Sequence, residues 1–477
     1  MIRVSKPTFL AISISVLTYC SLIIFYNSSS ISIGTAVYLL SLFGWILWLF
    51  VLFTWKKATG ELFSMYTIFV SFLILFSYGQ CLMWALGIHI PKEIGQYTNI
   101  PKVGISSFES IYNMQLLTLT SISFFHCGAL LSYRNKSTLE DNKIKETVND
   151  SDKTILRNIC SITFVISSIA TYIIWLGNMV INRTYGYGAY LYNAEASAGR
   201  NNILTLLSWM FVPSIIGLLI STDYSRWTRR LSYGLFLGYA VICTLAGYRS
   251  WIYELVILLW FHSKAYKKIS KKNMLLGSLL MIGILILATS LKNARQFGLT
   301  WEYIREAIVG ADNPIVAAFF EMGGSMNIGT IIISRPNFDY PYGNTYLLAI
   351  PGMITDRIIQ FFIPEYVSIG GWFSQSYLGL VGRGVGFSMI AESIVNYGVF
   401  GTPVWMMVMG LLMSRFIFSE RMDKSILSRF FSVSTCLMFL PIARNTFLST
   451  MKRWTFSTLS IAVLFLLINN MRRKRAK

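Results

Sequence analysis

Long apolar runs separated by short charged stretches repeat along the whole chain. The runs are about 14 to 27 residues long, and a helix of roughly 20 residues crosses a hydrocarbon layer ~30 Å thick. Twelve such runs lie at residues 8–26, 33–55, 62–88, 114–133, 159–176, 204–220, 231–248, 250–262, 274–291, 399–418, 430–443 and 455–468. The pattern therefore predicts an all-α polytopic membrane protein with about twelve transmembrane helices.

The composition agrees with this pattern. Of the 477 residues, 54% are hydrophobic and 13% are charged, whereas roughly a quarter of the residues in ordinary soluble domains are charged. These values exclude a soluble globular enzyme. The first run follows two basic residues, Arg3 and Lys6, and no small-residue cleavage site ends it, so we expect a retained helix rather than a cleaved signal peptide.

Basic residues set the expected orientation. The chain carries 41 Lys and Arg against 21 Asp and Glu, and in a membrane protein this charge must be divided by side. Twelve spans put both termini on one side, and the cytoplasm is favoured because 26 of the 41 basic residues then fall on inner segments. The outer segments hold 10 Arg and 4 Lys, and arginine binds phosphate through two parallel hydrogen bonds. We therefore expect an anionic ligand on the outer side and no nucleic-acid partner.

The predicted spans divide the chain into three parts. Residues 1–291 hold transmembrane helices 1–9 with a cytoplasmic loop at 134–157, and residues 399–477 hold helices 10–12 with a basic cytoplasmic tail. Between them, residues 292–398 form one long extracytoplasmic loop. Its apolar stretches, at 316–320, 347–350, 358–364 and 387–390, are too short to span a bilayer. We expect interfacial or re-entrant helices there.

Arg249 occupies the tip of a short predicted hairpin. Residues 231–262 leave each arm a rise of about 24 Å, less than the ~30 Å hydrocarbon core. Arg249 is therefore expected below the outer surface, where a charge is typical of a functional site. Two other interpretations are that Arg249 reaches a lipid phosphate or that it pairs with Glu254, one helical turn later.

Two carboxylates are candidates for a catalytic base. Glu392 lies in an otherwise apolar segment before a predicted span, with Asn396 one turn later on the same helix face. It could be a base or one half of an ion pair with Arg383. The long loop contains no histidine, so a base from it would be a carboxylate, with Glu321 as the second candidate.

Several kinds of site are absent from the sequence. It contains no Asp-x-Asp, no Walker loop and no dinucleotide-binding fingerprint, and its six cysteines form no CxxC or Cys/His cluster. Neither a cofactor nor a metal is expected, and any catalysis would depend on cationic side chains and positioning. Tyrosine-rich stretches at 185–192 and 340–342 suit sugar rings and equally suit the membrane interface.

Three stretches resemble those of the bacterial oligosaccharide repeat-unit polymerases of the Wzy type. They are LAGYRS at 245–250, YPYGNTY at 340–346 and ESIVNYG at 392–398. The resemblance implies a GT-C-like fold and a metal-independent glycosyltransferase of the bacterial cytoplasmic (inner) membrane, which extends O-antigen, lipopolysaccharide or capsule chains. Such an enzyme transfers the growing glycan from undecaprenyl diphosphate to the non-reducing end of another lipid-linked repeat at the outer leaflet. Membrane lipid and a chain-length regulator protein are the other partners that it implies.

The residues' placement suggests roles for individual side chains, and the resemblance adds that Arg249 and arginines of the long loop bind the diphosphate. Glu392 and Glu321 are the catalytic candidates, and the residues expected to bind substrate or diphosphate are Arg249, Arg295, Arg357, Arg383, Asn396, Tyr342 and Arg444. Two features depart from the pattern, since an Arg-x10-Gly motif is absent and the long loop lacks the histidine of related ligases. The alternatives are a lipid-linked oligosaccharide flippase or another transporter, and an O-antigen ligase.

Overall fold

A computed structural model describes most of the chain. The described residues are 5–28, 33–88, 106–133, 150–197, 202–246, 248–266, 314–335, 338–380, 386–418 and 425–475. Within these ranges every regular element is a helix, which confirms the predicted all-α fold. The predicted span at 274–291 lies outside the described residues.

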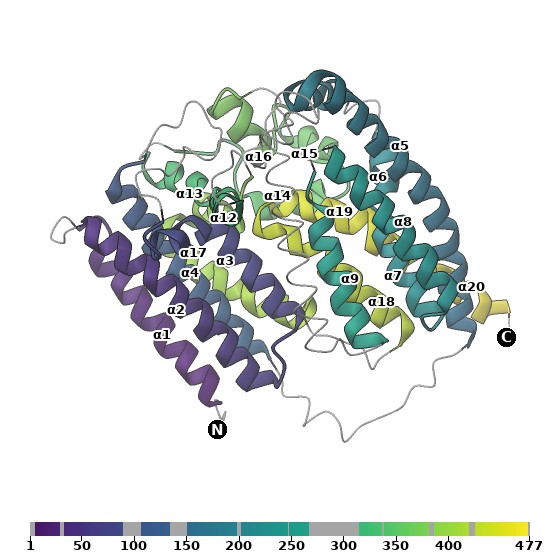
Figure 1. Ribbon diagram of the computed structural model, residues 1–477, viewed down its shortest axis with the longest axis horizontal. Helices are drawn as coiled ribbons and strands as arrows, with labels where there is room; N and C mark the ends of the chain where they lie inside the picture. Colours follow the sequence, from purple (N-terminus) through teal and green to yellow (C-terminus); the bar gives the residue numbers. More distant parts are fainter. Residues whose placement is uncertain are drawn as a thin grey trace.

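The helices form two groups that lie side by side (Figure 1). The first group comprises α1 (Lys6–Phe25), α2 (Ile33–Thr59), α3 (Met65–Trp84), α4 (Phe108–Ser132), α12 (Pro314–Gly323), α13 (Met326–Ile333) and α17 (Met389–Phe416). The second group comprises α5 (Asp150–Ser197), α6 (Asn202–Ser208), α7 (Phe211–Ser221), α8 (Arg226–Leu245), α9 (Trp251–Ala265), α18 (Ile426–Phe439), α19 (Phe447–Trp454) and α20 (Ser460–Arg475).

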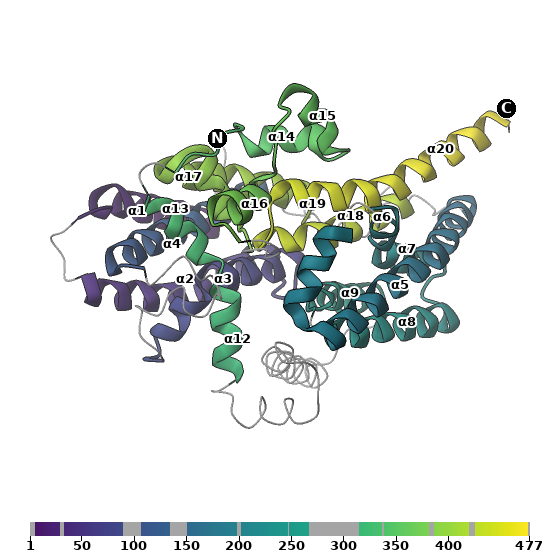
Figure 2. The same cartoon turned by 90° about the horizontal axis from the view of Figure 1, so that it is seen from above.

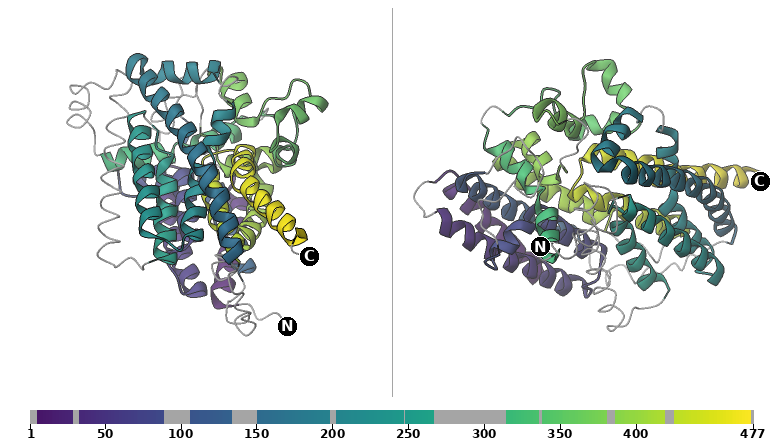
Figure 3. Two further views of the ribbon diagram at one scale, coloured as in Figure 1. Left: turned by 90° about the vertical axis from the view of Figure 1, so that its right-hand side faces the viewer. Right: turned by 45° about the horizontal axis from the view of Figure 1, so that its top comes forward.

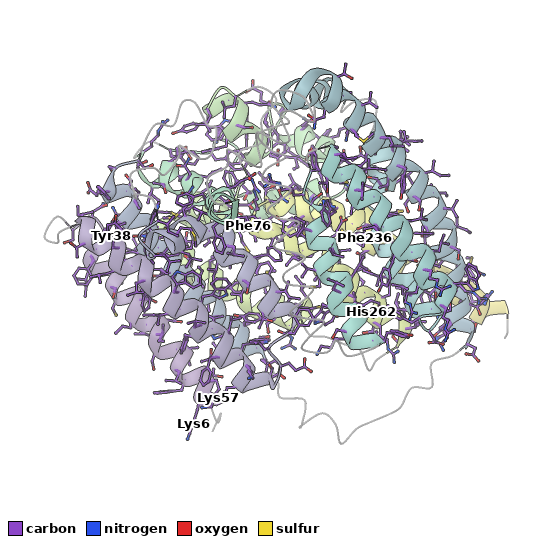
Figure 4. All side chains as sticks on the ribbon, viewed as in Figure 1. Lys6, Tyr38, Lys57, Phe76, Phe236 and His262 are labelled. Carbon is purple, nitrogen blue, oxygen red and sulfur yellow. The ribbon has the colours of Figure 1, made fainter. Side chains whose placement is uncertain are left out.

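Short helices lie at one end of these groups. They are α14 (Thr345–Gly352), α15 (Asp356–Phe362), α16 (Ile369–Gly371) and a π-helix over Trp372–Tyr377. Figure 1 draws α15 and α16 in the upper part of the molecule and α14 just below them, near α19, whereas Figure 4, in the same view, places Lys6 and Lys57 at the bottom. Two further turns interrupt the C-terminal helices, a 3₁₀-helix at Leu440–Ala443 and a π-helix at Thr455–Leu459.

Nine helical segments in the described part of the chain are long and apolar enough to cross a membrane, and each coincides with a predicted span. They are Lys6–Phe25, Ile33–Thr59, Met65–Trp84, Phe108–Ser132, Asp150–Asn182, Ile203–Ser221, Met389–Phe416, Ile426–Ala443 and Phe447–Lys474. The chain is therefore a multi-pass membrane protein. The two arms of the predicted hairpin form as α8 and α9, but α9 has only 15 residues and α8 begins with an arginine-rich turn. A total of twelve spans stays a prediction.

Two helices extend beyond their predicted bounds. α5 continues for 48 residues because no proline interrupts it and because Asp150 and Asp152 in its first turn suit a helix N-terminus. α17 begins ten residues before the predicted span at 399, and its backbone leaves the helical region at Gly398, where φ is 67° and ψ is −176°. Glycine adopts this positive φ without a steric penalty, so residues 389–397 form a separate short helix above the span.

Small residues allow the first group to pack tightly. A Cβ atom added to Gly128 of α4 would lie 2.0 Å from the carbonyl oxygen of Met407, and one added to Gly410 of α17 would lie 2.0 Å from that of Phe125. Helices can approach this closely only where glycine leaves no side chain at the contact, and such close packing favours helix association in lipid, which supplies no hydrophobic driving force between helices. The helices α4 and α17 thus pack closely against each other within the first group.

Candidate functional site

A cavity of about 560 Å³ lies where the second helix group faces α12 of the first group. Its walls come from α5, α6, α7, α8, α9, α12, α18 and α19 and from the turn after Ala443. Three arginines and two glutamates line it, namely Arg249, Arg444, Arg453, Glu254 and Glu321. Five charged groups in one cavity between membrane helices are typical of a functional site.

Arg249 lies in the turn between α8 and α9, as the hairpin predicts. Its Nη1 atom donates a hydrogen bond to Oε2 of Glu321 at 2.6 Å. The two side chains are 22% and 16% exposed, so the ion pair is partly shielded from solvent. Sequence analysis offered Glu254 as a partner of Arg249. The structure instead gives Arg249 an ion pair with Glu321, from a segment far away in the sequence.

The position of Glu321 depends on a close contact between α12 and α3. A Cβ atom added to Gly323 would lie 2.3 Å from the backbone nitrogen of Gln80, and one added to Gly79 would lie 2.8 Å from the carbonyl oxygen of Phe319. The side-chain amide of Gln80 also donates a hydrogen bond to the Phe320 carbonyl at 3.1 Å. Glycine on both helices thus lets α12 approach α3 closely, which fixes Glu321 at the cavity wall.

Arg453 and Glu254 form a second ion pair in the cavity. Nη2 of Arg453, on α19, lies 3.6 Å from Oε1 of Glu254, on α9. The pairing is incomplete, since Oε2 of Glu254 and Nε of Arg453 are buried and have no hydrogen-bond partner in the described part of the chain. Sequence analysis did not select Arg453. The sequence feature that could have identified it is that Arg453 is one of the ten arginines on the predicted outer segments and lies directly before the predicted span at 455–468.

Arg444 is the third cation of the cavity. It follows the 3₁₀-helix at Leu440–Ala443, and its guanidinium carbon lies 5.5 Å from the ring centroid of Phe76. Figure 4 shows Phe76 near the middle of the molecule, between the two helix groups. Within the described ranges, no carboxylate forms an ion pair with Arg444. The three arginines therefore outnumber the two glutamates, and the cavity is suited to an anion.

Aromatic side chains form much of the remaining wall. They are Trp175, Trp209, Phe211, Tyr239, Tyr248 and Tyr253. The rings of Trp175 and Tyr248 meet edge to face, with centroids 4.5 Å apart. Aromatic rings combine a large apolar face with a polar atom at the edge, which suits a ligand that carries sugar rings as well as charge.

Glu392 lies outside this cavity lining, in a dry hydrogen-bonded contact. It is 0% exposed; its Oε1 accepts from the Thr345 hydroxyl at 2.7 Å and its Oε2 accepts from the backbone N–H of Phe447 at 2.7 Å. Asn396 completes the contact, since its amide donates to the Thr345 hydroxyl at 2.8 Å and accepts from the Thr345 N–H at 2.7 Å. Glu392 therefore joins the first residues of α14 and α19 to α17. We name Glu392, Asn396, Thr345 and Phe447 the Glu392 cluster.

The other residues that the sequence selected are spread over the molecule. Tyr342 packs edge to face on Tyr340 and Tyr366, with centroids 5.3 and 5.7 Å apart, and burial raises the pKa of Tyr366 to about 12. Arg357 is exposed on α15. Arg295 and Arg383 lie outside the described residues. Of the seven residues expected to bind substrate or diphosphate, the structure thus brings Arg249 and Arg444 together in the cavity.

The fold and the cavity define a multi-pass helical membrane protein with a cationic, aromatic-walled site among its helices. The chain belongs to the family of the O-antigen polysaccharide polymerase Wzy, whose family model matches residues 10–475. Membership shows a role in polymerising O-antigen repeat units, which are lipid-linked oligosaccharides in a membrane. The chain matches neither a curated protein nor a solved structure.

Proposed function

We propose that this protein is a glycosyltransferase that transfers the growing glycan from undecaprenyl diphosphate to the non-reducing end of another lipid-linked repeat. The reaction takes place at the outer leaflet of the bacterial inner membrane, with both termini of the protein in the cytoplasm. The excess of arginine over glutamate in one cavity between the membrane helices carries this proposal.

The cavity charges suit the leaving group of this reaction. A lipid diphosphate carries about two to three negative charges, and fixed cations stabilise such charge most effectively in a site with little water. Arg444 is available without breaking an ion pair to any described residue, and Arg453 has a free buried Nε atom. Arg249 completes a three-arginine diphosphate site, and no metal ion takes part.

Glu321 is the proposed base because it is the sequence-selected carboxylate that lines the cavity. The acceptor hydroxyl oxygen attacks the anomeric carbon of the donor, and its proton passes to the Glu321 carboxylate. The bond between the anomeric carbon and the phosphate oxygen breaks, and the lipid diphosphate leaves with that electron pair. When the diphosphate binds Arg249, this arginine releases Glu321, whose carboxylate then becomes the better proton acceptor.

The test is a complementation experiment in cells that lack the gene. Surface glycan and carrier-lipid intermediates are separated on a gel from cells that express the native protein, Arg249→Ala or Arg472→Ala. Arg249→Ala should give single repeat units and no ladder, although an immunoblot should show the native amount of protein in the membrane. Arg472→Ala, an exposed arginine on α20, should give a normal ladder. A normal ladder from Arg249→Ala contradicts the diphosphate site.

The same gel separates the alternative functions. Cells without the gene should export and attach single repeats, because polymerisation alone is lost. Repeats that accumulate on the carrier lipid, with none attached at the surface, would instead identify a flippase. A full ladder that stays on the carrier lipid would identify an O-antigen ligase.

A further inference from the structure

The segment α14–α15, residues 345–362, is apolar on both of its faces. Its inner face packs Ala349 and Ile359 against Leu448 of α19 in a small separate core. Its outer face leaves Leu347, Ile350 and Ile354 more than half exposed, and Phe361 and Phe362 are 82% and 76% exposed. Leu347 and Ile350 share one face of α14, and Ile354 lies in the turn that follows this helix. An element of this kind has too much apolar surface to face water on its outer side.

The segment lies beside the membrane-spanning helices rather than on top of them. Figure 2 shows α14 and α15 projecting from the edge of the helical layer, next to α17 and α19, and Figure 3 shows the same green helices projecting sideways near one end of the helices. Tyr346 of α14 stacks on Tyr397 and lies 4.9 Å from the ring of Trp405, both on α17. Further along α17, Phe400 and Val404 are also exposed. The start of α14 therefore packs on a spanning helix that also exposes apolar side chains nearby.

A cation lies at the margin of this apolar face. Arg357 is exposed in the first turn of α15, four residues before Phe361. The neighbouring Asp356 is paired with Lys452 of α19, with Nζ and Oδ2 2.5 Å apart. Arg357, which forms no ion pair with a described residue, is thus next to the exposed aromatic residues, as in helices that lie in the headgroup region of a bilayer.

We propose that α14–α15 is an interfacial membrane anchor, whose partner is the headgroup region of the leaflet beside it. Its outer aliphatic and aromatic side chains enter the leaflet by about 5–10 Å, and Arg357 binds lipid phosphate. The Glu392 cluster gives the anchor its connection to the cavity. It holds Thr345, the first residue of α14, to α17 and to the start of α19, the helix that carries Arg453.

The test measures the depth of a fluorescent label in reconstituted full-length protein. Phe362→Cys and the control Ser376→Cys are each made with Cys20→Ser, because the other five native cysteines are buried. Ser376 is exposed on the π-helix after α16. Each protein is labelled with an environment-sensitive nitrobenzoxadiazole dye and placed in vesicles that contain nitroxide lipids. The nitroxide is attached to the headgroup, near the top of the acyl chain or deep in the chain.

The Phe362→Cys label should have blue-shifted emission, strong quenching by the headgroup and shallow nitroxides, and little quenching by aqueous iodide. The Ser376→Cys label should show the opposite pattern. Equal iodide quenching at the two positions would overturn the anchor. Quenching of Phe362→Cys only by the deep nitroxide would also overturn it, since the segment would then re-enter the bilayer. Efficient disulfide cross-linking between two Phe362→Cys copies would assign the face to a second copy of the chain.

Discussion

Glu321 and Glu392 are two carboxylates that sequence analysis selected for the same role, and the fold gives them different surroundings. Glu321 lines a cavity and pairs with Arg249 at 2.6 Å. Glu392 is completely enclosed, and among the described residues its carboxylate accepts hydrogen bonds from a hydroxyl and a backbone N–H, both neutral donors. An apolar sequence context predicts that a carboxylate is buried, but not whether it contacts a cation and a cavity or only structural donors.

This difference separates a chemical role from a structural one. A base must reach a substrate proton, which the cavity allows for Glu321. A carboxylate that is already occupied by two donors and sealed from a cavity instead stabilises the contact of the helices that supply those donors. The following predictions test whether the two glutamates have these separate roles.

The largest effect is expected from Glu321→Gln. The amide keeps the size of the side chain but cannot accept a proton, so polymer formation should fall about 10²- to 10⁴-fold. The thermal unfolding midpoint should stay close to that of the native protein. The measurement is the initial rate of polymer formation from lipid-linked repeats in reconstituted vesicles. A rate near the native value would remove Glu321 as the base and leave the proposed diphosphate site untouched.

Glu392→Ala should mainly reduce stability. Two buried donors, the Thr345 hydroxyl and the Phe447 N–H, would lose their acceptor, at a cost of about 1–3 kcal/mol each. Thermal unfolding followed by native fluorescence should show a clearly lower midpoint. Glu392→Gln keeps one acceptor oxygen, so its unfolding midpoint should lie between those of the native protein and Glu392→Ala. If Glu392→Gln instead unfolds normally but forms no polymer, Glu392 has the chemical role.

Gly323→Ala tests whether the reaction requires the position that the contact of α12 with α3 gives to Glu321. The added Cβ atom would clash with the backbone of Gln80 at 2.3 Å, so α12 must shift, at a cost of about 1–3 kcal/mol. The polymerisation rate should fall more than the quantity of folded protein does. Gly234→Ala on α8 is the matched control, because no atom lies within 4 Å of its added Cβ. Equal rates for the two variants would show that the contact of α12 with α3 does not position the base.

The smallest effect is expected from Lys452→Gln. This change removes the ion pair between Lys452 and Asp356, whose two side chains are 24% and 39% exposed, respectively. Such partly exposed pairs contribute about 0–1 kcal/mol to the free energy of unfolding. Polymer length and the unfolding midpoint should both be nearly unchanged. A loss of polymer comparable with that of Glu321→Gln would show that a charge outside the cavity also takes part in the reaction.

Much of the fold could be predicted from the sequence, because a helix in lipid must be apolar over a fixed length. The nine spans and the turn at Arg249 follow from that requirement. The pairing of Glu321 with Arg249 could not be predicted, since it depends on how α12 packs on α3. The pairing of Glu254 with Arg453 likewise joins helices from distant parts of the chain. The bend at Gly398 could not be predicted either, because the apolar pattern places the start of the span at residue 399 whereas α17 begins at Met389.

The ion pair between Arg249 and Glu321 also joins the two helix groups, since the turn between α8 and α9 belongs to one and α12 to the other. Any anion that takes Arg249 removes this link, so its measured affinity is lower than its intrinsic affinity by the free energy of the lost contact. The coupling is reciprocal. A force or a lipid environment that separates α9 from α12 must therefore strengthen anion binding, and a saturating anion must make that separation easier.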